Sequence, residues 1–390
     1  MKPKLFLFYT LICLLYFTCS KDLGGFRISD GLSLSLGGGG DEIGTGDTTK
    51  QNPAGIITAA EWNDLLNWPF WESIMNRDTI KEIPNVWHIY NTNRISVLVT
   101  DALRKPQVNI SVDLFSNTTG NIIFSTKTDN SGKAELWPSL FNNSQIILNN
   151  YSLNINKGEK LISNITFFAN GVNEVIINSA NNTNEVDIAF VVDATGSMSD
   201  EIDFLKNELY DVLQRIQDTL KDTKLMTSAV FYRDEGDDYL TRENPFSNNI
   251  TSTINFIKNQ SANGGGDFPE AVHSALDVSI NNLQWNIQAK NKIIFLLLDA
   301  PPHNNETVKN SLQKSISLAS SKGIKIIPIS ASGIDDATEL FLRMLAISTN
   351  STYIFITDDS GVGNPHKTPI VGKYTVEKLN NLLVRLVAKY

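Results

Sequence analysis

The sequence predicts an α/β protein in which a doubly wound parallel sheet follows a small β-sandwich. Two patterns predict this fold class. After Glu185, continuous apolar runs of strand length alternate with amphipathic stretches of helix length, which is typical of a parallel sheet covered by helices on both faces. Between Arg94 and Asn178, apolar and polar residues alternate with a period of two, which is typical of strands that bury one face.

The predicted parallel sheet lies in residues 185–390. Its strands are expected where apolar residues run together, at 186–192, 225–232, 293–298, 324–329 and 352–356. Helices are expected between them, for example at 200–220 and 270–283. A strand that is apolar on both sides must be covered on both faces, so this part is expected to form a domain of three layers.

The predicted sandwich occupies residues 94–180. Apolar and polar residues alternate from Ile95 to Val99, and Asp129-Asn130-Ser131-Gly132 has the composition of a turn. The stretch from Arg94 to Trp137 resembles a carboxypeptidase-regulatory-like or immunoglobulin-like module. That resemblance implies a spacer or an interaction surface.

The first residues are expected to be an export signal. Lys2 and Lys4 precede an apolar stretch at 5–17, which is too short to span a membrane comfortably. No later stretch approaches the roughly 18 apolar residues of a membrane helix. We therefore expect residues 1–18 to be a signal peptide and the protein to be secreted across the inner membrane.

Cys19 is the candidate for a lipid anchor. The chain has two cysteines, and Cys13 lies within the expected signal, so no disulfide is expected in the exported chain. The segment resembles a bacterial lipoprotein signal, in which the first residue after cleavage is a lipidated cysteine. The resemblance implies an anchor in the outer membrane or at the cell surface, and cleavage without lipidation is the alternative.

Two segments are expected between this anchor and the sandwich. Residues 19–55 are rich in Gly, Ser, Thr and Asp and are expected to form a flexible tether. Residues 56–93 are expected to be helical, because Thr58 opens a stretch that begins like a capped helix and that Pro69 interrupts. The aromatic residues here are expected to pack against the next domain rather than to stack on sugar rings; they include Trp62, Trp68, Phe70 and Trp71.

Charge excludes two classes of partner. The formal net charge is -9, and no long run of Lys and Arg occurs. Nucleic acids and anionic lipid surfaces attract proteins through clusters of positive charge, so neither is expected as a partner. Contact with a membrane is expected through the lipid anchor alone.

Carboxylate and hydroxyl side chains follow the first predicted strand of the parallel sheet. Asp193, Thr195 and Ser197 occupy alternate positions directly after that strand, and Asp299 ends another strand. In open α/β sheets, ligands bind at the carboxyl ends of the strands, so these side chains can meet there. Hard oxygen ligands suit a hard divalent cation. By itself, the Asp-Thr-Ser cluster is also typical of a helix start or a turn.

The strand, the loop, the helix after it and the later Asp299 occur in an order that resembles the metal-ion-dependent adhesion site of von Willebrand factor A domains. The resemblance covers residues 186–390. It implies a Rossmann-like fold and a Mg²⁺ site, with Ca²⁺ or Mn²⁺ as alternatives, whose ligands come from Asp193, Thr195, Ser197 and Asp299. It also implies cation-dependent binding or adhesion, in which an oxygen atom of an unknown protein or glycan completes the coordination.

One loop departs from the family pattern. Where the family gives the metal a threonine, this sequence has Gly264-Gly265-Gly266-Asp267-Phe268-Pro269-Glu270. We expect Asp267 to take that place as a metal ligand, and the alternative is a helix N-cap without metal contact. With a third carboxylate, the site would carry about one net negative charge when a divalent cation is bound. Binding of a partner would then depend less on a carboxylate group from that partner.

A second polar cluster is expected at the rim of the same site. Tyr232, Arg233 and Asp234 follow another predicted strand, and His303 lies shortly after Asp299. Together with the Gly-Gly-Gly-Asp-x-Pro-Glu loop, this Tyr-Arg-Asp stretch resembles a group of bacterial and kinase-associated A domains. These rim residues are expected to contact a ligand or, alternatively, to form a solvated loop.

Binding rather than catalysis is expected. No Gly-x-Ser-x-Gly motif, P-loop or cysteine–histidine pair occurs, and the histidines lack zinc-type spacing. There are two alternatives: a metal-dependent hydrolase with His303 as its base, and a structural surface protein whose metal site is empty.

Overall fold

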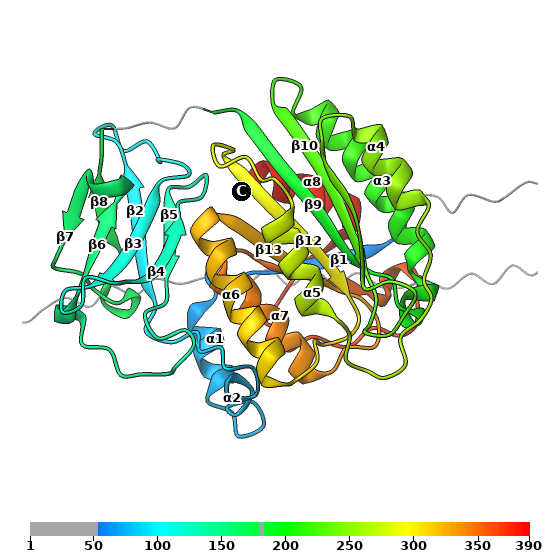
Figure 1. The fold of residues 1–390 in the computed structure, drawn as a ribbon, viewed down its shortest axis with the longest axis horizontal. Helices are drawn as coiled ribbons and strands as arrows, with labels where there is room; N and C mark the ends of the chain where they lie inside the picture. Colours follow the sequence, from blue (N-terminus) through cyan, green and yellow to red (C-terminus); the bar gives the residue numbers. More distant parts are fainter. Residues whose placement is uncertain (1–53, 179–182) are drawn as a thin grey trace, which may run out of the picture. The chain divides into compact units, whose positions relative to one another are not determined.

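An eight-stranded mixed sheet forms the centre of the α/β part of the protein (Figure 1). The structure is a computed structural model that describes residues 54–178 and 183–390. The strand order is β11-β10-β9-β12-β13-β14-β1-β15. The strands are β1 (Thr58–Trp62), β9 (Glu185–Asp193), β10 (Lys224–Tyr232), β11 (Thr241–Ser247), β12 (Asn291–Leu298), β13 (Ile324–Ser330), β14 (Tyr353–Thr357) and β15 (Val376–Lys378). The predicted signal at 1–18, Cys19 and nearly all of the tether at 19–55 lie outside the described residues.

Helices cover both faces of this sheet, as a doubly wound fold requires. Strands β10, β9, β12, β13 and β14 run parallel to their neighbours in this series. Helices α3 (Ile202–Thr219), α4 (Ile250–Lys258) and α8 (Leu379–Lys389) share one apolar core with the sheet. Helices α5 (Val272–Asp277), α6 (Glu306–Lys322) and α7 (Asp336–Ser348) share the other. The predicted α/β fold class is therefore confirmed.

Strand β9 shows why the apolar runs of the sequence are continuous. Ile188 and Phe190 belong to the core shared with α3 and α8, whereas Ala189 and Val191 belong to the core on the opposite face. Successive side chains of a strand point to opposite faces, and both faces are covered here. Every residue of β9 after Glu185 is consequently buried.

Strand β1 corrects the prediction for residues 56–93. The stretch expected to begin a helix at Thr58 is instead a strand that pairs antiparallel with β14 on one side and β15 on the other. Only the later part is helical, in α1 (Trp68–Met75) and α2 (Ile83–Trp87), and Pro69 lies in the first turn of α1 rather than breaking a helix. Residues that precede the sandwich in the sequence thus complete the sheet that follows it.

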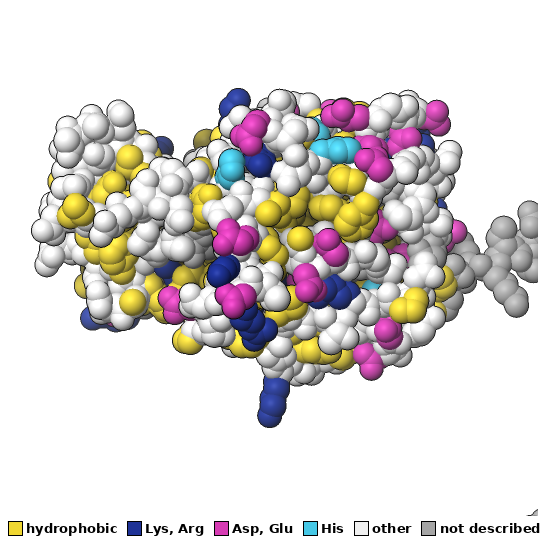
Figure 2. Space-filling model, turned by 90° about the horizontal axis from the view of Figure 1, so that it is seen from below, with side chains coloured by type: hydrophobic (Ala, Val, Ile, Leu, Met, Phe, Trp, Pro, Cys, Tyr) yellow, Lys and Arg dark blue, Asp and Glu magenta, His cyan; other side chains and the backbone are white. Residues whose placement is uncertain are grey.

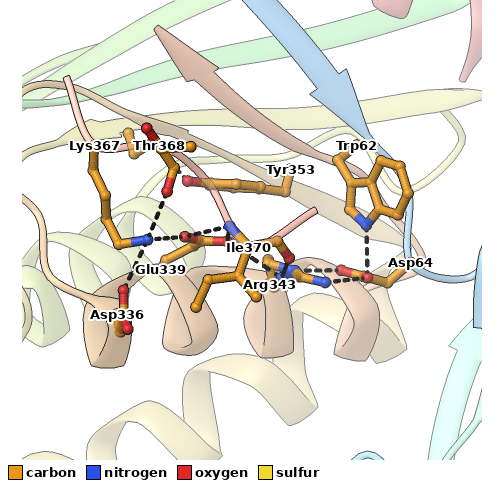
Figure 3. Close-up of polar contacts among 10 residues, drawn as sticks. Trp62, Asp64, Asp336, Glu339, Arg343, Tyr353, Lys367, Thr368 and Ile370 are labelled. Atoms are coloured by element: carbon orange, nitrogen blue, oxygen red, sulfur yellow. Dashed lines mark hydrogen bonds and ion pairs between the residues drawn. The ribbon is translucent and has the colours of Figure 1, made fainter. Parts of the chain in front are cut away.

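A buried network of charges fastens this N-terminal segment to helix α7 (Figure 3). The Trp62 indole N–H donates to Asp64 Oδ1 at 2.8 Å. On α7, Glu339 accepts a hydrogen bond from the Ile370 N–H at 2.8 Å and pairs with Lys367 at 2.6 Å. Arg343 joins the two halves of this network, because its guanidinium contacts both Asp64 and Glu339.

The sandwich consists of two small sheets. One has the order β5-β2-β8 and the other β4-β3-β6-β7. Its strands are β2 (Ile95–Thr100), β3 (Ser111–Ser116), β4 (Ile122–Lys127), β5 (Lys133–Leu136), β6 (Tyr151–Ile155), β7 (Lys160–Ile162) and β8 (Asn173–Ile176). The expected turn at 129–132 is present, with the Gly132 N–H donating to the Asp129 carbonyl oxygen. It connects strands of different sheets.

The tryptophan side chains of residues 56–93 are buried. Trp62, Trp68 and Trp71 are at most 7% exposed. Trp68 packs against Trp137 of the sandwich, with ring centroids 5.6 Å apart. Such rings have no free face on which a sugar could stack, which agrees with the packing role expected for them. Among the described residues, no helix has the length and apolar character needed to cross a membrane.

Candidate functional site

The first loop of the site follows β9 and is held by its own side chains. Asp193, the last residue of β9, is fully buried. Its Oδ1 accepts hydrogen bonds from the Thr195 N–H at 2.9 Å and from the Thr195 hydroxyl at 2.7 Å. The Thr195 and Ser197 hydroxyl oxygens lie 3.1 Å apart. Within the described residues Asp193 Oδ2 accepts no hydrogen bond of ordinary geometry. The buried Tyr232 side chain beside it nevertheless lowers the pKa of Asp193. The loop thus presents a second carboxylate oxygen beside the Thr195 and Ser197 hydroxyls.

The second part of the site follows the neighbouring strand β12. Val192 of β9 pairs in parallel with Leu297 of β12, so the residues beyond both strands lie at the same edge of the sheet. Asp299 lies there and is 4% exposed, close enough to Ser197 for that side chain to lower its pKa. Its Oδ1 has no hydrogen-bond partner among the residues that the structure describes. The structure therefore brings the predicted residues of the first loop and Asp299 together.

Hydrogen bonds hold the glycine-rich loop against the first loop and against Asp237, which follows β10. The Gly196 N–H donates to the Gly264 carbonyl oxygen at 3.0 Å. The Gly265 N–H donates to Asp237 Oδ2 at 2.8 Å. Gly264 has φ +80°, and a Cβ atom there would lie 2.4 Å from the Asp237 carboxylate. Only glycine permits both this backbone conformation and this close approach.

Glu270, rather than Asp267, is the buried acid of this loop. Glu270 is 3% exposed, and its N–H donates to the Pro301 carbonyl oxygen at 2.8 Å. Its Oε2 has no hydrogen-bond partner in the described part of the chain. Asp267 lies at the same pocket with an exposed side chain. The sequence interpretation missed Glu270 because it followed the position where the family has threonine.

Ser197, the glycine-rich loop and Asp299 line one pocket of about 450 Å³, whereas Asp193 and Thr195 are not among its lining residues. Ser197, Asp267, Glu270 and Asp299 are its polar side chains, and glycines form much of the remaining wall. A larger cavity of about 730 Å³ lies between β4 and α6, where Ile122 and Leu318 contribute to an apolar lining. We assign function to the smaller pocket because it contains buried carboxylates with unpaired oxygen atoms, which the larger one lacks within the described residues.

The buried carboxyl groups of the site have raised pKa values. Burial is the main cause in each, and neighbouring carboxylates add to it. Together these effects raise the pKa of Asp193 to about 6, that of Asp299 to about 7 and that of Glu270 to about 9. A positive charge placed among them would favour their ionised forms.

Two of the residues expected at the rim are buried instead. Tyr232 is fully buried at the end of β10, beside Asp193. Arg233 is 5% exposed, and its guanidinium donates to the carbonyl oxygens of Ala194 at 3.1 Å and Ser261 at 3.0 Å. Arg233 thus connects the first loop to the chain that leads into the glycine-rich loop. Neither residue can contact a partner at an exposed rim.

The other two residues expected at the rim form a pair, of which Asp234 is also buried, at 7% exposed. His303 Nε2 lies 2.7 Å from Asp234 Oδ1, and the His303 side chain is 24% exposed. Acidic side chains and histidines gather in the upper right part of the face that Figure 2 shows. Within the described residues, no three or more His, Cys, Asp or Glu side chains could hold a metal ion among themselves. A metal at this pocket would therefore depend on hydroxyl ligands such as that of Ser197 as well.

Glu201 is a second acid that the sequence interpretation missed. It is 1% exposed and accepts a hydrogen bond from the Ser332 N–H at 3.1 Å. His366 Nε2 lies 3.1 Å from the same oxygen, Oε1. The negative charge of Glu201 contributes to the raised pKa of Asp299. Its position after the first loop was the available signal, but its partners come from loops far along the chain.

Comparison with known proteins places a family match over the α/β part. Residues 187–364 match the family described as von Willebrand factor A domain. A putative ariadne-like RING finger protein of Acanthamoeba polyphaga mimivirus is 34% identical over 131 residues, which cover 34% of this chain and 12% of that protein. The alpha-protein kinase vwkA of Dictyostelium discoideum is 28% identical over 144 residues, which cover 36% and 22%. The chain thus spans a small part of either relative.

Two solved structures are distantly similar. The pilus adhesin SpaC of Lactobacillus rhamnosus GG aligns with a TM-score of 0.34 at 15% identity, covering 44% of this chain and 28% of the adhesin. The conserved hypothetical protein BatB of Bacteroides thetaiotaomicron aligns with a TM-score of 0.35 at 12% identity, covering 52% and 98%. The doubly wound sheet and the family match agree over the same residues. This chain therefore contains a von Willebrand factor A domain, matched over residues 187–364.

Proposed function

We propose that this protein is an extracytoplasmic binding or adhesion protein whose A domain holds a divalent cation, with Mg²⁺ the first candidate and Ca²⁺ or Mn²⁺ as alternatives. Asp193, Ser197 and Asp299 are the proposed core of the site. A cation held there would offer an open coordination position to an oxygen atom of a partner. The partner is a protein or a glycan.

The observation that carries this proposal is a set of unpaired carboxylate oxygen atoms, one lining the pocket at Asp299 and one in the adjoining first loop at Asp193. Asp193 Oδ2 and Asp299 Oδ1 are buried, and neither has a hydrogen-bond partner within the described residues. A buried carboxylate oxygen without a partner is costly, so native proteins normally give it a hydrogen bond or an ion. Carboxylate and hydroxyl oxygens are the ligands that Mg²⁺ and Ca²⁺ prefer. The residues present fit a divalent cation.

Each residue has a separate task in the proposed site. Asp193 offers Oδ2, because Thr195 already occupies Oδ1 and fixes the orientation of the carboxylate. Ser197 is exposed at the pocket and offers its hydroxyl. Asp299 acts directly or through a bound water molecule. Thr195 positions Asp193 and Ser197, and its own hydroxyl is the fourth candidate ligand.

The proposed location rests on the export signal and on Cys19. A lipid on Cys19 would hold the protein at the outer membrane or cell surface, and substitution of Cys19 by serine would release it into the soluble fraction. Retention of the Cys19→Ser form in the membrane fraction would contradict the anchor. Nucleic acid is not a proposed partner, because the net charge is -9.

Affinity capture from the source cell, with the purified protein as bait, tests the binding function. Partners should be retained with Mg²⁺ and released by EDTA. An Asp193→Ala bait should retain none of them, because it lacks the free oxygen that the first loop offers. Identical capture by both baits, with and without EDTA, would refute cation-dependent binding.

The proposal gives His303 no catalytic task. Its contact with Asp234 is also the arrangement in which a carboxylate orients a histidine base, and this keeps a metal-dependent hydrolase as the second candidate. Turnover of phosphoester or peptide substrates that His303→Ala abolishes would favour the hydrolase. A protein without any Mg²⁺-dependent change in melting temperature would be a structural surface protein instead.

A further inference from the structure

We propose that Glu270, and not Asp267, supplies the carboxylate of the glycine-rich loop to the cation, and that the resulting negative site selects a neutral oxygen of the partner over a carboxylate. The partner group is then a hydroxyl or a carbonyl oxygen, as carried by a glycan or by a serine, threonine or amide side chain. This inference rests on the proposed cation site and specifies its ligand class.

The position of Glu270 supports its role as a ligand. The side chain is 3% exposed, and Oε2 has no hydrogen-bond partner among the described residues. A Cβ atom on Gly265 would lie 2.9 Å from Glu270 Oε1 and 3.3 Å from the Thr195 Cβ. The carboxylate of Glu270 therefore reaches the same point of the glycine-rich loop that the first loop contacts. Because Gly265 has no side chain, it does not separate the Glu270 carboxylate from the first loop.

The backbone directs Glu270 toward the pocket. Its N–H donates to the Pro301 carbonyl oxygen, and Glu270 forms a parallel bridge with Pro302. Both proline residues belong to the loop that starts at Asp299, so this contact ties Glu270 to the second part of the site. Asp267 has no such constraint, and its exposed carboxylate can remain hydrated.

The charge of the pocket decides which partner group is favoured. Asp193 and Glu270 are the proposed direct ligands, and Asp299 acts through a bound water molecule, because no three acidic side chains of the described residues could hold an ion among themselves. The three carboxylates together still carry one negative charge more than a divalent cation neutralises. Further acids follow β10 at the same edge of the sheet, namely Asp234, Glu235, Asp237 and Asp238. Arg233 is the cation in this stretch, and it is buried and contacts Asp238 at 3.7 Å. An incoming carboxylate is therefore repelled, whereas a neutral oxygen is not.

Isothermal titration of the full exported chain with Mg²⁺ tests the identity of the ligand. Glu270→Gln removes the charge and keeps the size of the side chain, and Asp267→Asn is the matched control in the same loop. We expect Glu270→Gln to weaken Mg²⁺ binding at least about tenfold, because loss of even an outer-shell partner of a metal ligand costs about 10–100-fold in affinity. Asp267→Asn should change the affinity less than about twofold. The reverse order of effects would overturn the assignment.

Acetate serves as the carboxylate probe for ligand class. Mg²⁺ affinity is measured in acetate and in chloride at equal ionic strength, for wild type and for Glu270→Thr, which introduces the neutral residue of the family pattern. We expect acetate to leave wild type unchanged relative to chloride and to tighten binding by Glu270→Thr. Equal acetate effects in both proteins would overturn the inference.

The outcomes separate this inference from the proposed function. If wild type binds no Mg²⁺, the cation site itself is refuted, and the inference with it. If wild type and Glu270→Gln bind Mg²⁺ equally, the site stands and Glu270 is not its ligand. Melting curves in EDTA check folding, and we expect Glu270→Gln to melt no lower than wild type because a buried carboxyl group has been replaced by an amide.

Discussion

The Arg343 guanidinium lies 2.6 Å from Asp64 Oδ1 and donates a second hydrogen bond to Asp64 Oδ2 at 2.9 Å. The two residues are 279 positions apart in the sequence, and both are buried. This bidentate pair connects the segment before the sandwich to helix α7 behind it. Because neither charge has access to water, each depends on the other for its stability.

Asp64→Asn should therefore strongly destabilise the protein. Removal of one partner leaves the Arg343 charge buried and incompletely paired, which costs about 3–5 kcal/mol in comparable buried pairs. Urea denaturation of both forms measures this loss of unfolding free energy. Asp78→Asn is the control, because Asp78 forms an exposed ion pair with Lys81 that contributes about 0–1 kcal/mol. Equal midpoints for Asp64→Asn and wild type would show that the network contributes little.

Removal of Asp193 should separate cation binding from folding. The metal-free Asp193→Asn protein should melt at or above the temperature of metal-free wild type, because a buried carboxylate without a full set of partners is lost. Saturating Mg²⁺ should raise the melting temperature of wild type. At a hundredfold excess over the dissociation constant, bound Mg²⁺ adds about 2.7 kcal/mol to the free energy of unfolding. Saturating Mg²⁺ should leave the melting temperature of Asp193→Asn unchanged. A Mg²⁺ shift of equal size in both proteins would exclude Asp193 as a ligand.

The stability of the metal-free protein should fall as pH rises. Burial and neighbouring carboxylates raise the pKa of Asp299 to about 7 and that of Glu270 to about 9, whereas unfolded carboxyl groups titrate near roughly 4. Between these values the folded state binds more protons than the unfolded state. The stabilisation is thus complete below pH of about 4 and is lost as pH rises toward neutrality and above.

Melting temperatures in EDTA across this pH range measure the effect. Mg²⁺ should oppose this loss of stability, so the Mg²⁺-induced rise in melting temperature should be larger at mildly alkaline than at mildly acidic pH. In Asp299→Asn the melting temperature should fall less steeply as pH rises. The comparison with that variant matters because burial also raises the pKa of Asp187, outside the pocket, to about 6. Stability that rises between about pH 4 and 7 in EDTA would contradict the raised pKa values. Above that range Lys292 acts in the opposite direction, because burial lowers its pKa to about 7.

Gly264→Ala should damage the proposed cation site more than Gly236→Ala. Both glycines have positive φ, at +80° and +95°, so each substitution carries a backbone cost of about 1–2 kcal/mol. At Gly264 the new Cβ would also lie 2.4 Å from the Asp237 carboxylate, whereas at Gly236 nothing lies within 4 Å. We expect only Gly264→Ala to weaken Mg²⁺ binding in calorimetry. Equal Mg²⁺ affinity in both variants would show that Asp237 does not position the loop.

The sequence was sufficient to predict the parallel sheet, because burial on both faces leaves a signal within each strand. The run from Val186 to Val192 is apolar throughout except for Asp187, and such a run has few alternative structures. Strand β1 gave no comparable signal. Its residues, Thr58 to Trp62, include two alanines and a glutamate, and the strand that it pairs with lies almost 300 residues later. A local pattern cannot reveal so distant a partner.

The candidate site was predictable in its first loop but not in its glycine-rich loop. Asp193, Thr195 and Ser197 follow a strand at fixed spacing, so their meeting follows from the strand itself. Whether Asp267 or Glu270 enters the pocket depends on how the glycine-rich loop contacts the chain after β12. That contact is made by the backbone of Glu270 with Pro301 and Pro302, and no spacing rule predicts it.

Strand β1 also determines how this A domain can be produced in isolation. A recombinant fragment cut at the start of the family match, residue 187, would omit the strand that covers β14 and β15. Its β14 would become an open sheet edge, prone to pair with other molecules and to aggregate. Expression of the binding unit alone therefore requires residues 54–93 to be retained and the sandwich to be replaced by a short linker, rather than an N-terminal truncation.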